Sequence, residues 1–178
     1  MIIKKDLLDI NKYSRPGKSL GDVRGIVVHW VAGPMMTAAG VRRYFNSLSE
    51  EKRFAGTQYV IGLEGEIIRM IPENEMAYHV GAKSYKEDAL ARLGSYPNAH
   101  TIGIETCHPD WYGKLNRQTV ESLVELCADL LMRYSLTADD LWRHYDVTGK
   151  ACPKYYVDNP HEWTQLKQNV MLMMEVLS

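Results

Sequence analysis

The sequence has few of the features that mark secreted or nucleic-acid-binding proteins. It contains only three cysteines, and this odd number argues against a disulfide framework and for thiols that are buried or bound to metal. It has no basic run, and 21 Lys and Arg nearly balance 22 Asp and Glu, which leaves a formal net charge of −1. The electrostatic footprint of a nucleic-acid binder is missing, so we expect no nucleic acid as a partner.

Long apolar runs are also missing. The first ten residues, MIIKKDLLDI, are too polar for a signal peptide, and no later stretch reaches the length needed to span a bilayer. We therefore expect a chain that is made in the cytoplasm without a signal peptide and has no membrane partner. The length of 178 residues predicts a single domain over residues 1–178, with an irregular lead-in over residues 1–22.

The pattern of apolar residues predicts strands that alternate with helices. Arg24–Val31 is nearly all apolar or β-branched, as in a strand buried on both faces, and Thr101–Thr106 is a second short apolar strand. Turn residues and helical spacing predict the remaining elements: a hairpin over 57–71, helices over 37–48, 116–134 and from 159 onward, and a loop-rich stretch over 72–100 with a helical turn or two near 84–92. Because a hairpin interrupts the alternation, we expect an α/β fold with a mixed central sheet flanked by helices.

The most informative stretch is RHYDVTGKACP, residues 143–153, which places His144 and Cys152 eight residues apart around a polar loop. Zinc binds imidazole and thiolate well, and a loop of this length lets both converge on one ion. Lys150 lies on the thiol's side of an extended segment, where a cation lowers a thiol's pKa and stabilises an oxyanion. A lone His–Cys pair is more often packed or solvated than metal-bound, and catalytic zinc needs three protein ligands.

Two histidines compete for the third ligand position. His29 stands near the end of an apolar strand, where a buried imidazole either hydrogen-bonds within the core or binds a metal, and the residues alone leave these two interpretations about even. His79 is the competitor. The remaining histidines are expected at the surface or pointing away from a shared ion: His100, His108 and His161.

Five motifs occur in the order, and at about the separations, found in one known family: IVVHW, TQYVIG, AYHVG, NAHTIGIE and RHYDVTGKACP. Over residues 24–153 the chain thus resembles the zinc-dependent N-acetylmuramoyl-L-alanine amidases of the type-2 class, which includes phage endolysins and peptidoglycan recognition proteins. The resemblance implies one zinc per chain, in a groove at one end of the sheet. It implies His29, His144 and Cys152 as the metal ligands, with Glu105 and Lys150 as the catalytic pair.

The same resemblance suggests roles for two further residues. Tyr59 in TQYVIG matches a tyrosine that some members place near the metal, and His79 in AYHVG matches a histidine that faces the substrate groove. The expected reaction is hydrolysis of the amide bond between muramic acid and L-alanine in peptidoglycan. Glu105 would take a proton from the attacking water and pass it to the departing amine, while Lys150 would stabilise the tetrahedral oxyanion.

The resemblance also implies a setting for this enzyme. We expect a bacteriolytic protein of phage or prophage type, either a single-domain enzyme or a catalytic fragment, that acts as a monomer on the cell wall after release at lysis. The alternative is a non-catalytic peptidoglycan-binding module of the same fold. Such modules need not keep the thiol ligand, so Cys152 beside Glu105 and Lys150 favours the enzyme. A structural zinc domain would need a fourth protein ligand, and none is evident.

Overall fold

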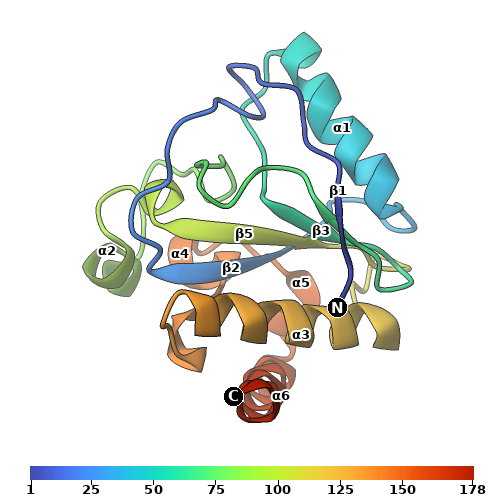
Figure 1. Ribbon diagram of the computed structural model, residues 1–178, viewed down its shortest axis with the longest axis vertical. Helices are drawn as coiled ribbons and strands as arrows, with labels where there is room; N and C mark the ends of the chain where they lie inside the picture. Colours follow the sequence, from blue (N-terminus) through green and yellow to red (C-terminus); the bar gives the residue numbers. More distant parts are fainter.

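In the computed structural model, which describes residues 1–178, a mixed six-stranded sheet lies between layers of helices (Figure 1). The sheet has the order β1-β4-β3-β5-β2-β6, and every neighbouring pair is parallel except the β3–β4 hairpin. The strands are β1 Ile3–Lys5, β2 Gly25–Trp30, β3 Tyr59–Ile61, β4 Ile67–Arg69, β5 Thr101–Thr106 and β6 Leu141–Arg143. The predicted α/β fold with a mixed sheet is confirmed.

Helices cover both faces of this sheet. They are α1 Ala38–Glu51, α2 Glu87–Leu93, α3 Arg117–Arg133, α4 His144–Thr148, α5 Lys154–Asp158 and α6 Pro160–Leu177, with short 3-10 turns η1 Pro97–Ala99 and η2 Ala138–Asp140. Figure 1 shows α3 and α6 on one side of the sheet and α1 on the other. The Thr37 hydroxyl caps α1 by accepting from the backbone N–H of Gly40 at 3.0 Å, as N-cap threonines do. None of the helices combines the length and apolarity needed to span a bilayer.

Three short elements differ from the sequence-based expectation. The lead-in over residues 1–22 contains β1, which pairs in parallel with β4 at the edge of the sheet. β6 forms the opposite edge, and the segment after it begins a short helix, α4, instead of continuing as a loop. Each edge strand has three residues, which is too short for apolar alternation to be recognised, because a period of two needs at least four positions to stand out.

Side-chain alternation on the two central strands, β2 and β5, determines which of their residues lie on each face of the sheet. Ile26 and Val28 of β2 lie in the core on the α3 side, and so do Ile102 and Ile104 of β5. The intervening residues therefore point to the opposite face. β2 and β5 are parallel with His29 opposite Glu105, so these two side chains lie next to each other on one face near the carboxyl ends of both strands.

The same alternation places Tyr59 on the α3 side of the sheet, within the main core and away from the face that carries His29. Its hydroxyl donates to the carboxylate of Glu73. Tyr134 donates to that carboxylate at 2.6 Å, and the guanidinium of Arg133 does so at 2.7 and 3.0 Å. The expectation that Tyr59 lies beside the metal or the substrate is thus corrected. Its position in β3 directs the ring towards α3, on the face of the sheet opposite His29.

The Glu73 cluster predicts an acid-dependent contribution to stability. Burial raises the pKa of the Glu73 carboxyl, but hydrogen bonds from Arg133, Tyr134 and Tyr59 outweigh burial and lower the pKa to about 2. A depressed folded-state pKa stabilises the protein above the unfolded-state value and loses this contribution as the pH falls from about 4.5 towards 2. Glu73→Gln should therefore lower the free energy of unfolding by on the order of 2 kcal/mol at pH 7, and by less at pH 3.

Urea unfolding of zinc-free parent and variant at both pH values measures this difference. Glu121→Gln is the matched control, because Glu121 forms an exposed ion pair with Arg117 on α3 and such pairs contribute little. A difference between parent and Glu73→Gln that is the same at pH 7 and pH 3 would show that the charge of Glu73 is not what stabilises the cluster.

Candidate metal centre and active site

Three side chains converge at the carboxyl end of β2. His29 lies near the end of that strand, His144 is the first residue of α4, and Cys152 follows the loop after α4. All three are buried. The Nδ1 atoms of His29 and His144 are 3.1 Å apart, the Sγ atom of Cys152 is 3.8 Å from His29 Nδ1, and all three atoms lie within 4.8 Å of one another.

This group fits a zinc ion in both geometry and chemistry. Tetrahedral zinc with bond lengths of about 2.0 Å to nitrogen and 2.3 Å to sulfur places two nitrogens roughly 3.3 Å apart and a nitrogen and a sulfur roughly 3.5 Å apart. Two of the three observed separations, 3.1 and 3.8 Å, are close to these values, and the third pair of atoms lies within 4.8 Å. Two imidazoles and one thiolate form a donor set that zinc prefers and leave a fourth position open, as catalytic zinc sites require.

The two histidines are held in the form that can bind a metal. Burial lowers the pKa of His29 well below its usual value, with further lowering by the neighbouring histidines and Lys150. Burial, with smaller contributions from the charges of Lys150 and His79, lowers the pKa of His144 to about 3. Both imidazoles are therefore neutral near pH 7 and keep a lone pair for a ligand.

The thiol of Cys152 has a raised pKa and keeps its proton near pH 7 in the metal-free protein. Burial and the charge of Glu105 raise the pKa of the Cys152 thiol to about 12, and Lys150 lowers it only in part. Lys150 thus lowers the pKa of the thiol, as the sequence indicates, but in the metal-free protein burial outweighs this one nearby cation. A metal ion must therefore displace a proton from Cys152 when it binds.

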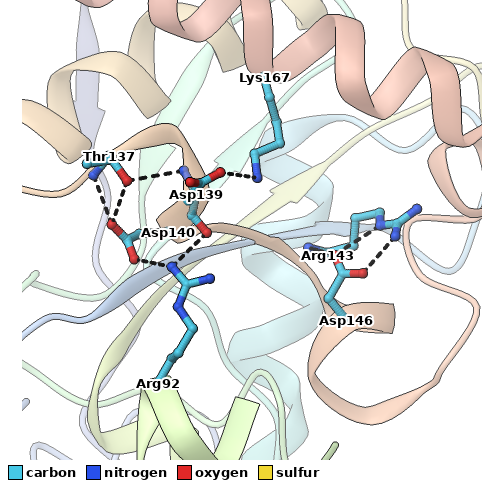
Figure 2. A network of polar contacts seen from close by, with 7 residues as sticks. All are labelled: Arg92, Thr137, Asp139, Asp140, Arg143, Asp146 and Lys167. Atoms are coloured by element: carbon cyan, nitrogen blue, oxygen red, sulfur yellow. Dashed lines mark hydrogen bonds and ion pairs between the residues drawn. The ribbon is translucent and has the colours of Figure 1, made fainter. Parts of the chain in front are cut away.

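The start of α4 fixes the direction of His144. Immediately before it, Arg143 donates its backbone N–H to the Asp146 carboxylate at 2.9 Å and its guanidinium to the same carboxylate at 2.7 and 3.0 Å (Figure 2). A third guanidinium bond runs to the carbonyl of Tyr156 at 2.9 Å. These contacts hold the first turn of a helix that is too short to be stable alone.

A second set of contacts in Figure 2 secures the strand that leads into α4. Arg92 of α2 donates to Asp140 at 2.6 Å and to the backbone carbonyl of Asp139 at 3.0 Å, and Lys167 of α6 lies 3.7 Å from the Asp139 carboxylate. Thr137 and Asp140 complete a capping box around η2. The turn before β6 is thereby tied to helices on both sides of the sheet.

The loop after α4 returns Cys152 to His144. Gly149 ends α4 with a φ of +86°, in the left-handed region that glycine adopts without strain. The backbone N–H of Tyr145, the residue after His144, then donates to the carbonyl of Cys152 at 2.9 Å. This bond closes the loop, so His144 and Cys152, which are eight residues apart in the sequence, point their ligand atoms into the same site.

Glu105 and Lys150 line the same cavity as the three candidate ligands, and the cavity has a volume of about 220 Å³. The Oε2 atom of Glu105 is buried and has no hydrogen-bond partner. Burial raises the pKa of the Glu105 carboxyl to about 8, against the opposing charge of Lys150. A buried carboxylate oxygen without a partner is costly, and such groups are concentrated where substrate or solvent supplies the missing contact.

The cavity continues into a larger groove of about 410 Å³. His79, His144 and Lys150 line both parts, and Phe54, Tyr78 and Tyr96 contribute aromatic walls to the larger one. The cavity that holds the candidate ligands therefore adjoins an extended, partly aromatic groove, which suits a long substrate better than a small one.

His79 also meets His29, but from the side opposite the other ligands. Its Nδ1 atom lies 2.9 Å from His29 Nε2, the ring nitrogen that points away from His144 and Cys152. The geometry therefore favours His29 over His79 as the third ligand. Thr101 and Asn98 contact His79, and neither could be recognised from the sequence, because polar residues at or before the start of a strand give no signal of a distant histidine.

Fold and site together define a class of α/β proteins in which a His-His-Cys group that could hold a metal ion lies in a cavity at the carboxyl ends of the central strands. Residues 19–155 match the family described as N-acetylmuramoyl-L-alanine amidase (Amidase_2), and the chain belongs to this family.

Similar proteins agree with this assignment. The chain is 35% identical over 166 residues to a probable N-acetylmuramoyl-L-alanine amidase from Bacillus licheniformis, covering 93% of this chain and 46% of the relative. It is 32% identical over 180 residues to the N-acetylmuramoyl-L-alanine amidase BlyA from Bacillus subtilis (strain 168), covering 97% and 48%. The chain spans about half the length of these curated relatives.

Solved structures share the fold. PlyL superposes with a TM-score of 0.76 at 20% identity, covering 96% of this chain and 97% of the other. The catalytic domain of XlyA gives a TM-score of 0.72 at 20% identity, covering 96% and 99%. The sheet and helices described above are therefore the common architecture of these domains.

Proposed function

We propose that the chain is a zinc-dependent amidase that hydrolyses the bond between N-acetylmuramic acid and L-alanine in bacterial peptidoglycan. The observation that supports this most strongly is a single cavity lined by three metal-binding side chains, His29, His144 and Cys152, together with Glu105 and Lys150. The names of relatives at 32 to 35% identity point to the same reaction. A single catalytic domain, a monomeric state, phage origin and action at the wall after lysis remain predictions from the sequence.

The metal would be held by His29, His144 and Cys152. A zinc ion bound by two neutral imidazoles and one thiolate supplies a net charge of about +1, which polarises a carbonyl group and lowers the pKa of water.

Glu105 is the proton carrier in this proposal. Its Oε2 atom has no hydrogen-bond partner in the protein, and its side chain lines the cavity that the candidate ligands share, so the ionised carboxylate can accept a proton from the attacking water. The environment gives its carboxyl a high proton affinity, with a pKa of about 8 in the metal-free protein. The same carboxyl then passes the proton to the nitrogen of L-alanine, which leaves as an amine.

Lys150 stabilises the negative charge that develops on the carbonyl oxygen. Its side chain lines the cavity from an exposed loop. One preorganised donor of this kind contributes about 3 kcal/mol to the transition state, so Lys150→Ala should lower kcat and kcat/KM together by about 10²-fold, with substrate affinity nearly unchanged. Steady-state kinetics on a soluble muramyl peptide, with equilibrium binding to the zinc-free protein, measures both quantities.

Lys83→Ala is the matched control for this change, because Lys83 is an exposed lysine that lines neither part of the groove. An unchanged kcat for Lys150→Ala would show that Lys150 does not stabilise the oxyanion. Weaker binding with unchanged kcat would instead assign Lys150 to a carboxylate of the bound substrate.

The overall function is tested on purified peptidoglycan. Incubation with the zinc-loaded protein should release peptides that begin with a new L-alanine amino group, detected by amine labelling and mass spectrometry, and leave glycan strands without peptide. Glu105→Gln and chelator-treated protein serve as controls. A non-catalytic wall-binding module would sediment with the walls and release no new amine.

A further inference from the structure

His79 contacts the ring nitrogen of His29 that points away from the candidate metal site. The Nδ1 atom of His79 is 2.9 Å from Nε2 of His29, and the rings meet edge to face at 87° with centroids 5.1 Å apart. His29 Nδ1, on the other side of its ring, faces His144 and Cys152. The two nitrogens of His29 thus have separate partners, and the partner of Nε2 decides which nitrogen carries the hydrogen.

Thr101 determines the tautomer of His79. The Nε2 atom of His79 lies 3.1 Å from the Thr101 hydroxyl and 3.3 Å from the Thr101 carbonyl. The carbonyl can only accept, and the hydroxyl donates its hydrogen to the carbonyl of Pro97 at 2.8 Å, so it too accepts from His79. His79 Nε2 must therefore carry the hydrogen, and in a neutral imidazole this leaves Nδ1 as an acceptor.

The acceptor nitrogen of His79 in turn determines the tautomer of His29. Since His79 Nδ1 accepts, His29 Nε2 must donate to it, and the lone pair of His29 is then on Nδ1, directed towards His144 and Cys152. We propose that His79 is a positioning residue that holds His29 in the Nε2–H tautomer, with its metal-binding lone pair already in place. This inference rests on the proposed metal site, and it gives His79 a role distinct from contact with substrate.

The surroundings of His79 are built to hold the ring still. The Asn98 side-chain oxygen accepts from the backbone N–H of His79 at 3.1 Å and from that of Val80 at 2.9 Å. Beneath the ring, Gly103 leaves the space that a side chain would fill, because a Cβ atom there would lie 2.7 Å from Cγ of His79 and 2.8 Å from Nδ1. Backbone, ring plane and both ring nitrogens of His79 are thus constrained, as partners of metal ligands need to be.

The tautomer is measured in the zinc-free protein by nitrogen NMR of ¹⁵N-labelled histidine. We expect the parent to show hydrogen on Nε2 of His29 and a lone pair on Nδ1, and His79→Leu to show a mixture. His79→Asn offers an amide oxygen at the same number of bonds from Cβ as Nδ1, so it should restore the Nε2–H form. Hydrogen on Nδ1 of His29 in the parent would overturn the inference without any variant.

Zinc affinity, measured by competition with a chromogenic chelator, gives the second readout. His79→Leu should bind zinc about 10- to 100-fold more weakly than the parent, and His79→Asn should recover most of the loss. His161→Leu is the control, since it removes an exposed histidine that lines neither part of the groove. If His79 only contacted substrate, zinc affinity would stay at the parent value and KM alone would rise, and the inference would be wrong. If the parent bound no zinc, the proposed function would fail, whereas the tautomer of His29 would still decide this inference.

Discussion

Cys152→Ala, His29→Ala and His144→Ala should each lose most of the zinc that the parent protein retains, which we expect to be about one ion per chain. Two ligands do not hold zinc well, and the three ligand atoms are close enough that each contributes directly. Zinc content after gel filtration measures the loss. Binding to the folded state alone adds about 2.7 kcal/mol at a free zinc concentration one hundred times the Kd, so the parent should also melt at a lower temperature once a chelator is added, and the variants should not respond.

Cys127→Ala is the matched control for the thiol. Cys127 is a fully buried cysteine on the core-facing side of α3, so its replacement removes a thiol from the interior without touching the metal site. This variant should lose stability through the cavity and keep its zinc. Zinc at the parent level in His29→Ala would show that the third ligand is not His29 and would return that position to His79, its competitor in the sequence.

The parts of the fold and site that could be predicted are those that depend on the local pattern of residues along the chain. β2 and β5 are mostly apolar stretches of six residues, and both could be predicted as strands, whereas the pairing of His29 with Glu105 depends on the register between them. The helices α1 and α3 follow from apolar stripes and cap residues. The pairing of His144 with Cys152 follows from a loop length that the structure closes with one backbone hydrogen bond.

What could not be predicted depends on contacts between distant parts of the chain. The face occupied by Tyr59 depends on the register of a three-residue strand, and a shift of one residue reverses it. The pKa of Cys152 depends on how completely the fold buries the thiol, which the adjacent Lys150 does not reveal. The contact of His79 with His29 joins residues 50 positions apart through a loop-rich segment that has little periodicity to read.

Glu105→Gln should keep the fold and the zinc but lose about 10²- to 10⁴-fold in kcat, which is the usual contribution of a positioned proton carrier. The change keeps the shape of the side chain and removes only its ability to take up a proton. Turnover on a soluble muramyl peptide measures the loss, and Glu73→Gln, on the opposite face of the sheet, is the control that should retain turnover.

Stability separates this role from a structural one. Because the folded-state pKa of Glu105 is raised to about 8, the parent carboxyl ionises more readily when unfolded, and between about pH 4.5 and 8 this favours unfolding. Zinc-free Glu105→Gln should therefore be at least as stable as the parent at pH 7, whereas a carboxylate that held the fold together would leave a less stable variant. If Glu105 instead oriented a ligand, zinc affinity would fall along with kcat. A kcat within a few-fold of the parent, with zinc bound, would show that Glu105 does not carry the proton.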